Sequence, residues 1–342
     1  MTLCHRSSSD SITRVSAADI LVTWPDFDVD DAETGGRLTA AGHGVRLAPK
    51  LGRRSPADLA RLLDGVAGAI VSTDPFDAGV LGRARGLRVI ARVGVGTDSI
   101  DVEAATQHGV AVCITPGANA ATTADHAVAL MLAALRRIPE HDRAVRAGGW
   151  PRGQDATPWE LSGATVGLVG YGTIGQLVAR RLDGFAVRIL ACDPVPPDGG
   201  ENVHPIELDE LLPASHVVSL HAPLTQATAL LMDRRRIGLM RPDAVLVNTA
   251  RGGLIDEAAL VDALESRRIR AAGLDVFADE PPASARLRRL PNIILTPHMG
   301  GVSERSVAEM TRQATAAVLA VLDGGRPDGL VNPDVLVGNG RS

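Results

Sequence analysis

The sequence predicts an α/β fold with two doubly wound parallel sheets, each covered by helices on both faces. Two observations predict it. Short apolar runs alternate with amphipathic stretches, which is typical of parallel strands joined by crossover helices. This alternation stops at 115–117 and then begins again, in a chain whose 342 residues exceed one ordinary hydrophobic core.

In the first half, five apolar runs predict strands and the stretches between them predict helices. The expected strands are 20–22, 45–47, 69–71, 89–91 and 111–113, and the expected helices are 33–41, 55–63, 77–85 and 101–108. A long, largely apolar helix follows at 119–137. Residues 143–158 are rich in Gly, Pro and Trp and predict an extended arm.

The second half repeats the pattern. Its expected strands are 166–169, 187–192, 217–220, 244–247, 272–274 and 293–295, and a final helix is expected at 303–322. Because that helix comes after the last strand, we expect it to return to the first domain. The predicted domains are therefore 19–115 with 299–332, and 116–298, flanked by a disordered tail at 1–18 and a second tail at 333–342.

Composition narrows the classes of function. The net charge is −5 and no long basic run occurs, so nucleic acid is not an expected partner. Three scattered cysteines predict neither disulfides nor a metal site, and favour a reducing, cytoplasmic location. No apolar stretch is long enough to suggest a membrane span, and no membrane partner is expected.

A glycine-rich loop follows the first strand of the second half. Gly170, Gly172 and Gly175 match G-x-G-x-x-G between a predicted strand and a predicted helix, the context of a dinucleotide-binding loop. Asp193 stands eighteen residues beyond Gly175, at the end of the next strand. A carboxylate there suits a ribose 2′-hydroxyl and repels a 2′-phosphate, so NAD is expected and NADP is less favoured.

Three polar residues follow later strands of the same half. Arg251 can hold a carboxylate through two parallel hydrogen bonds, and His298 can exchange a proton with an alkoxide. Glu280 is the expected hydrogen-bond partner of His298. Each has an ordinary structural explanation alone, but together, beside a dinucleotide loop, they indicate reduction of a 2-keto acid.

These residues, in this order, resemble the D-isomer-specific 2-hydroxyacid dehydrogenase family, and are most similar to its phosphoglycerate dehydrogenase branch. The resemblance covers about 20–332 and rests on the stretches 92–101, 170–175, 221–225, 248–253, 273–277 and 297–301. It implies an NAD-binding Rossmann domain inserted into a flavodoxin-like substrate domain, and a homodimer formed through the second domain and the 143–158 arm. It implies an enzyme that interconverts a D-2-hydroxy acid and its 2-keto acid.

The resemblance also assigns individual roles. Arg251 and His298 would contact both substrate and cofactor, and the backbone at Val95 and Gly96 would bind the substrate carboxylate. Asp275 would hold the nicotinamide carboxamide. The remaining cofactor residues would be Gly170, Gly172, Thr173, Ile174, Gly175, Asp193, His221, Ala222, Pro223, Thr228, Thr249, Ala250 and Gly300.

Two features leave alternatives open. Phosphoglycerate enzymes of the family place an arginine after the third strand, where 71–75 here offers no base and one acid, Asp74. Because an acid repels a phosphate, 3-phosphoglycerate is a doubtful substrate and the 2-hydroxy acid stays unassigned. Some proteins that share this scaffold are NAD-sensing corepressors or oxidise phosphite, and both remain alternatives.

Overall fold

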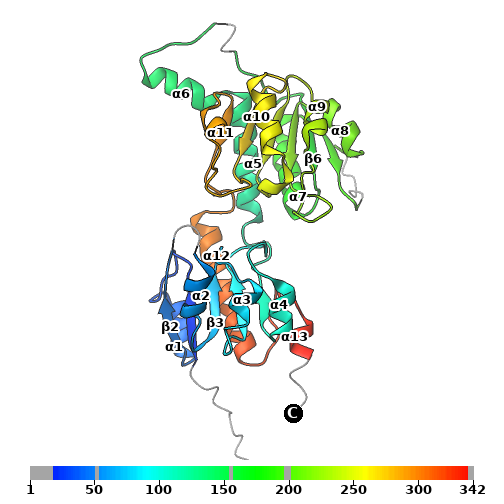
Figure 1. Cartoon of the computed structure of the whole chain (residues 1–342). Coiled ribbons are helices and arrows are strands. Elements are labelled where there is room, and N and C mark those ends of the chain that lie inside the picture. The colour runs from blue at the N-terminus through cyan, green and yellow to red at the C-terminus, as the bar shows by residue number, and fades with distance from the viewer. Residues whose placement is uncertain (1–17, 51–53, 154–156, 196–201, 338–342) are drawn as a thin grey trace, which may run out of the picture. The chain divides into compact units, whose positions relative to one another are not determined.

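The computed structural model describes residues 18–50, 54–153, 157–195 and 202–337 (Figure 1). The chain divides into two compact units: unit 1 comprises Met1–Ala118 with Glu304–Ser342, and unit 2 comprises Asn119–Ser303. The predicted disordered tail, 1–18, falls almost entirely outside the described residues.

Unit 1 contains a five-stranded parallel sheet in the order β2-β1-β3-β4-β5. Its strands are β1 (Asp19–Val22), β2 (Gly44–Leu47), β3 (Val66–Val71), β4 (Val89–Arg92) and β5 (Ala111–Cys113). Its helices are α1 (Gly35–Ala40), α2 (Pro56–Leu62), α3 (Ala78–Leu81), α4 (Val102–Gln107), α12 (Glu304–Leu322) and α13 (Asp334–Val337).

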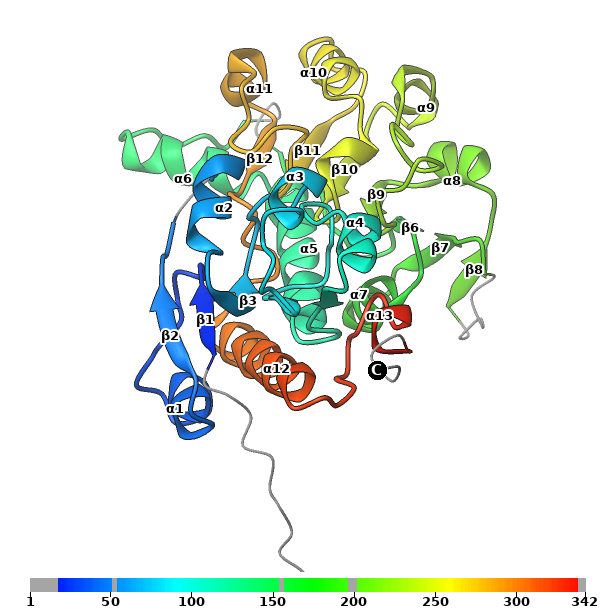
Figure 2. The ribbon, with the colours of Figure 1, turned by 60° about the horizontal axis from the view of Figure 1, so that its bottom comes forward.

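Helices cover both faces of this sheet, which explains why its inner strands β1, β3, β4 and β5 are largely apolar, whereas the edge strand β2 has no buried residue. Ile20 and Val22 point to the face covered by α12, whereas Leu21 between them points to the opposite face, where α2, α3 and α4 pack. Figure 2 shows α12 on one side of these strands and α2, α3 and α4 on the other. The helix α12 therefore completes the core of unit 1. The 333–342 segment was expected to be a tail, but Asp334–Val337 form the short helix α13.

Unit 2 contains a seven-stranded parallel sheet in the order β12-β11-β10-β9-β6-β7-β8. Its strands are β6 (Thr165–Val169), β7 (Arg188–Cys192), β8 (Val203–Pro205), β9 (Val217–Leu220), β10 (Val245–Asn248), β11 (Ala271–Leu274) and β12 (Ile293–Leu295). Its helical segments are α5 (Ala120–Leu135), α6 (Ile138–Arg146), α7 (Thr173–Leu182), η2 (Asp183–Phe185), α8 (Leu208–Ala214), α9 (Arg234–Leu239), η3 (Gly252–Leu254), α10 (Glu257–Glu265) and α11 (Ala285–Arg289).

The prediction of two doubly wound parallel sheets is confirmed. Within unit 2, α5 and α7 pack on one face of the sheet, and α8, α9 and α10 on the other. The 143–158 arm was expected to be extended, but Arg143–Arg146 form the last turn of α6. The edge strand β8 was not expected, because only one of its three residues is buried.

Because every strand of unit 2 is parallel to its neighbours, the carboxyl ends of these strands, which the predicted site residues follow, all meet at one edge of the sheet. This is the edge at which ligands bind in open α/β sheets. We call it the carboxyl edge of unit 2.

Candidate active site

The glycine loop leads from β6 into α7 at the carboxyl edge of unit 2. Gly170 has a φ of +95°, and a Cβ on it would lie 2.6 Å from the Ala222 backbone nitrogen, so only glycine fits. A Cβ on Gly175 would lie 2.4 Å from the Gly170 carbonyl oxygen. Gly172 precedes α7, and no side chain caps the first turn of that helix. The N–H groups there, including those of Thr173 and Ile174, are therefore available to an anion such as pyrophosphate.

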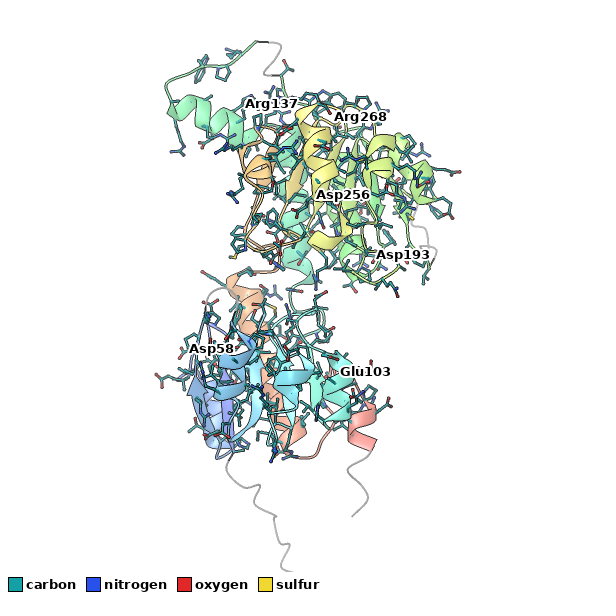
Figure 3. The ribbon with its side chains drawn as sticks, viewed as in Figure 1. Asp58, Glu103, Arg137, Asp193, Asp256 and Arg268 are labelled. Atoms are coloured by element: carbon teal, nitrogen blue, oxygen red, sulfur yellow. The ribbon has the colours of Figure 1, made fainter. Side chains whose placement is uncertain are left out.

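Asp193 follows β7 and is labelled in Figure 3. Its Oδ2 atom accepts a hydrogen bond of 2.7 Å from the Tyr171 backbone N–H, and its Oδ1 atom accepts one of 2.9 Å from that of Val195. These contacts hold the carboxylate beside the glycine loop. The sequence spacing predicted this proximity, but did not predict the direct contact with Tyr171.

A second polar loop, which begins at His221, follows β9 at the same edge of the sheet. The His221 backbone N–H donates to the Val169 carbonyl at 2.7 Å, and the Thr228 hydroxyl donates to the Pro223 carbonyl at 2.6 Å. The Nε2 atom of His221 is buried without a hydrogen-bond partner, and burial lowers the pKa of this imidazole to about 4. His221 is therefore neutral at physiological pH, and Ala222 follows it against Gly170.

Arg251 is positioned by the residue that ends β10. The Asn248 side chain is fully buried; its Oδ1 accepts from the Ala250 N–H at 3.0 Å and its Nδ2 donates to the Arg251 carbonyl at 2.9 Å. Gly252 comes next, and a Cβ there would lie 1.9 Å from the Phe277 carbonyl carbon. The turn at Thr249–Arg251 is thus fixed from both sides. The sequence identified this stretch as functional but not Asn248 as the residue that shapes it.

Asp275, at the end of β11, is 1% exposed and its carboxylate is satisfied from within unit 2. It accepts hydrogen bonds from the Thr296 hydroxyl at 2.6 Å and from the backbone N–H groups of Met299 and Gly300 at 2.9 and 2.7 Å. The His126 Nε2 atom lies 3.4 Å from the carboxylate. Burial alone would raise the pKa of Asp275, but these donors outweigh it and lower that pKa, so the group is ionised.

Asp275 was predicted to contact the nicotinamide carboxamide. Its hydrogen bonds also position the segment that carries His298. Its backbone carbonyl accepts from the His298 N–H at 2.9 Å, and its side chain anchors the two residues that follow His298. Asp275 is therefore a positioning residue for the imidazole. His126 and Thr296 share this task, and neither was predicted from the sequence.

The proposed acid/base group is the His298–Glu280 pair. His298 Nδ1 lies 2.8 Å from Glu280 Oε2, and Glu280 Oε1 accepts from the Phe277 N–H at 3.2 Å. Burial would raise the pKa of Glu280, but the hydrogen bond and the charge of His298 outweigh it and hold that pKa below its ordinary value. The carboxylate is therefore ionised at neutral pH, and accepts from Nδ1–H. The Nε2 atom of His298 makes no hydrogen bond within the described residues.

The predicted carboxylate cradle, Val95 and Gly96, lies in unit 1, in the loop that follows β4. Thr115 braces that loop: its hydroxyl accepts from the Gly94 N–H at 2.9 Å, and its own N–H donates to the Gly94 carbonyl at 3.0 Å. Val95 is 42% exposed. The loop therefore offers backbone at the carboxyl edge of the unit 1 sheet.

Asp74 is the one acid of the 71–75 stretch, and the structure pairs it with a base from outside that stretch. Asp74 Oδ1 lies 2.8 Å from Arg54 Nε, and its Oδ2 accepts from the Thr23 hydroxyl at 2.5 Å. No sequence pattern indicated this pair, since Arg54 is twenty residues away and belongs to the crossover after β2.

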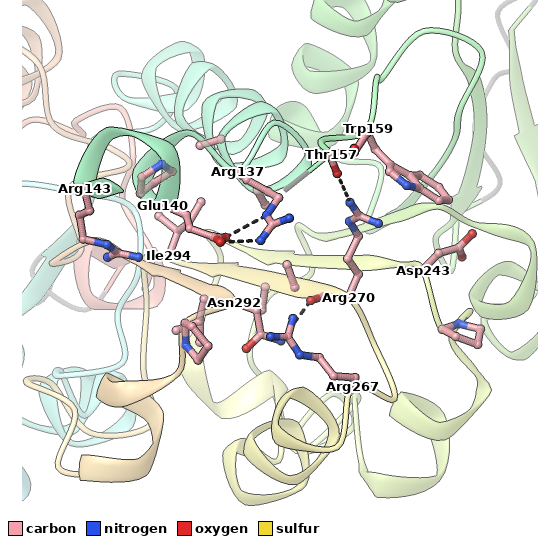
Figure 4. Close-up of a pocket in the computed structure, with 18 residues that line it drawn as sticks. Arg137, Glu140, Arg143, Thr157, Trp159, Asp243, Arg267, Arg270, Asn292 and Ile294 are labelled. Atoms are coloured by element: carbon pink, nitrogen blue, oxygen red, sulfur yellow. Dashed lines mark hydrogen bonds and ion pairs between the residues drawn. The ribbon is translucent and has the colours of Figure 1, made fainter. Parts of the chain in front are cut away.

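A large pocket of unit 2, about 630 Å³, lies away from this site (Figure 4). Asp243, Arg270 and Asn292 line it, and each precedes one of the strands β10, β11 and β12, so the pocket opens at the opposite edge of the sheet. The candidate catalytic residues Arg251, Glu280 and His298 therefore do not line this pocket.

The part of the chain that the structure describes shows no metal site, no membrane-spanning helix and no activated thiol. No group of His, Cys, Asp and Glu there could hold a metal ion, and no helix there is long and apolar enough to cross a membrane. Burial raises the pKa of Cys113 to about 12, and it also raises that of Cys192, so neither thiol is an activated nucleophile.

Comparisons with known proteins agree with this geometry. A family model described as D-isomer specific 2-hydroxyacid dehydrogenase, NAD binding domain, matches residues 128–300. The chain is 41% identical over 290 residues to D-3-phosphoglycerate dehydrogenase of Mycobacterium tuberculosis, covering 81% of this chain but 54% of that protein. It thus spans about half the length of this curated relative.

Two further relatives match over most of their length. Glyoxylate reductase of Korarchaeum cryptofilum is 41% identical over 277 residues, covering 78% of this chain and 83% of that protein. The crystal structure of a protein from Thermus thermophilus superposes with a TM-score of 0.85 and 38% identity, covering 92% of this chain and 99% of that one.

Proposed function

The chain belongs to the D-isomer-specific 2-hydroxyacid dehydrogenase family, and we propose that it is an oxidoreductase that interconverts a D-2-hydroxy acid and its 2-keto acid. One observation carries the proposal. A Glu280–His298 pair with a free Nε2 atom lies on the same sheet edge as Arg251 and a dinucleotide loop.

In the reductive direction, Arg251 holds the substrate carboxylate through its guanidinium and His298 Nε2 donates a proton to the keto oxygen. Glu280 stabilises the imidazolium and keeps the Nδ1 proton in place, so that Nε2 is the atom that exchanges it. The backbone N–H groups at Val95 and Gly96 are the further carboxylate contact that the family resemblance implies. The bound nicotinamide cofactor supplies the hydride.

Cofactor preference follows from Asp193. Its carboxylate stands beside the glycine loop, where the adenosine ribose of a dinucleotide binds in this motif. A fixed negative charge there accepts hydrogen bonds from ribose hydroxyls and repels a 2′-phosphate. We therefore propose NAD rather than NADP, with the Gly170–Gly175 loop, the 221–228 loop and Thr249–Ala250 lining the same site.

The proposal predicts NADH-dependent reduction of at least one small 2-keto acid. A panel of glyoxylate, pyruvate, hydroxypyruvate, longer 2-keto acids and phosphorylated ones, followed by NADH absorbance, measures it. We expect kcat/KM with NADH to exceed that with NADPH by about tenfold or more, which corresponds to about 1.4 kcal/mol of discrimination. Absence of turnover with every acid and both cofactors would contradict the proposal and favour the corepressor alternative, which a peptide pull-down tests.

We also propose that the protein is a cytoplasmic homodimer. Its three cysteines suit a reducing compartment. The helix α6 buries none of its residues, and Ile138, Val145 and Trp150 in and after it are 53%, 50% and 75% exposed. Such apolar exposure beside a large pocket is typical of an interaction surface, and a second copy of this chain is the proposed occupant.

Charge on α6 should separate the two subunits. We expect Val145→Asp to convert a dimer into the 35.6 kDa monomer in light scattering, because a carboxylate would be buried in the interface without a partner. Leu47→Asp in unit 1, where Leu47 is 48% exposed, is the matched control and should leave the mass unchanged. A wild-type protein that is monomeric at micromolar concentration would contradict the dimer.

A further inference from the structure

Thr23, Arg54 and Asp74 form a buried polar cluster in unit 1. The cluster lies at the position in the sheet where open α/β folds bind their ligands. From β1 the chain moves outward to β2, whereas from β3 it moves the other way to β4 and β5, so the sheet reverses direction between β1 and β3. Ligands of open α/β sheets bind outside the carboxyl ends of strands at such a switch point. The Thr23–Asp74 hydrogen bond spans this point, because Thr23 follows β1 and Asp74 lies in the loop after β3.

Arg54 completes the cluster from the crossover between β2 and α2. Its Nε donates to Asp74 Oδ1 at 2.8 Å and its Nη2 donates to the Ala48 carbonyl at 2.6 Å. The side chains of Arg54 and Asp74 are each 9% exposed. Both oxygens of Asp74 are therefore engaged, and two edges of the Arg54 guanidinium are occupied by partners from this chain.

This pairing balances the charge of Arg54 at this edge of the unit 1 sheet. An arginine at a switch point is suited to bind a phosphate through parallel N–H donors. Here Asp74 cancels the charge of Arg54 and occupies the Nε edge that such binding would use. The neighbouring strand β4 leads to Val95 and Gly96, so the cluster lies on the sheet edge that carries the proposed carboxylate cradle.

Resting on the proposed function, we propose that Asp74 is a specificity-determining residue that masks a latent anion site centred on Arg54. With Asp74 in place, the enzyme selects 2-keto acids whose side group is uncharged and rejects those that carry a phosphate. Loss of the Asp74 charge exposes the guanidinium to an anionic side group.

An alternative explanation is that the pair only ties Arg54 to the loop after β3. The two explanations differ in what happens when Asp74 loses its charge. A purely structural pair predicts a loss of stability with no new affinity for anions, since a buried cation is left without a charge to balance it. A masked site predicts that an added anion replaces the missing carboxylate.

Asp74→Asn is the test variant, and Arg54→Gln combined with Asp74→Asn is its matched control. The first readout is the melting temperature in inorganic phosphate against chloride of equal ionic strength. We expect phosphate to raise the melting temperature of Asp74→Asn by several degrees, and to have little effect on the wild type or the double variant. Destabilisation of Asp74→Asn without phosphate rescue would overturn the proposal.

The second readout compares hydroxypyruvate with 3-phosphohydroxypyruvate, which share a carbon skeleton and differ only in the phosphate. We expect the ratio of their kcat/KM values to shift toward the phosphorylated acid by about tenfold or more in Asp74→Asn, and to return in the double variant. An unchanged ratio would overturn the proposal. If no variant reduces any 2-keto acid, the proposed function fails, whereas the phosphate-dependent melting still reports on the masked site.

Discussion

Replacing His298 with alanine should lower kcat for the best 2-keto acid by about 10²–10⁴-fold, the range typical of losing a general acid. The expected size follows from the hydrogen bonds around the ring. Glu280 holds Nδ1 at 2.8 Å and leaves Nε2 as the atom that exchanges the proton. The other described histidine beside a carboxylate of this edge is His126, whose Nε2 is engaged by the Thr296 hydroxyl at 2.9 Å and lies 3.4 Å from Asp275, so it does not replace His298.

The defect should be confined to the chemical step. NADH affinity, measured by fluorescence titration, should change by no more than a few-fold, because the glycine loop and Asp193 lie on other strands of the sheet. His204→Ala, on the edge strand β8, is the matched control and should retain wild-type turnover. If His298→Ala keeps kcat within about threefold of the wild type, the acid/base assignment fails.

Much of the fold could be predicted because its signals are local in the sequence. The inner strands of both sheets are buried on two faces, so most of them are continuous apolar runs that can be recognised without knowing their partners. The glycine loop was recognised for the same reason, since its glycines, strand and helix are contiguous. The strand β8 was missed because it lies at the sheet edge, with two of its three residues exposed.

The contacts that shape the site are not local, and the sequence could not reveal them. Asp275 is anchored by Thr296, twenty-one residues later, and Thr23 reaches Asp74 across fifty-one residues. In both cases the partners meet only because parallel strands bring their ends to one edge. Sequence spacing could therefore name Arg251, Glu280 and His298, but not the residues that hold them in place.

Arg251 carries the other large expected effect. Arg251→Ala should lower kcat/KM for the best 2-keto acid by about 10²–10³-fold, equivalent to about 3–4 kcal/mol, the scale expected for losing a two-point charged contact to a carboxylate. The Asn248 amide and the close approach of Gly252 to Phe277 fix the Arg251 backbone. The guanidinium Nη1 atom donates to the Ala250 carbonyl at 2.7 Å, so the side chain as well as the backbone is tied to this turn.

Geometry as well as charge should matter at this position. Arg251→Lys keeps the charge but loses the planar fork, so it should recover only part of the loss. Arg289→Ala, which removes an exposed arginine of α11, is the control and should match the wild type. Steady-state kinetics with one 2-keto acid, together with NADH titration of each variant, separates substrate handling from cofactor binding. A kcat/KM for Arg251→Ala within about threefold of the wild type would rule out the carboxylate clamp.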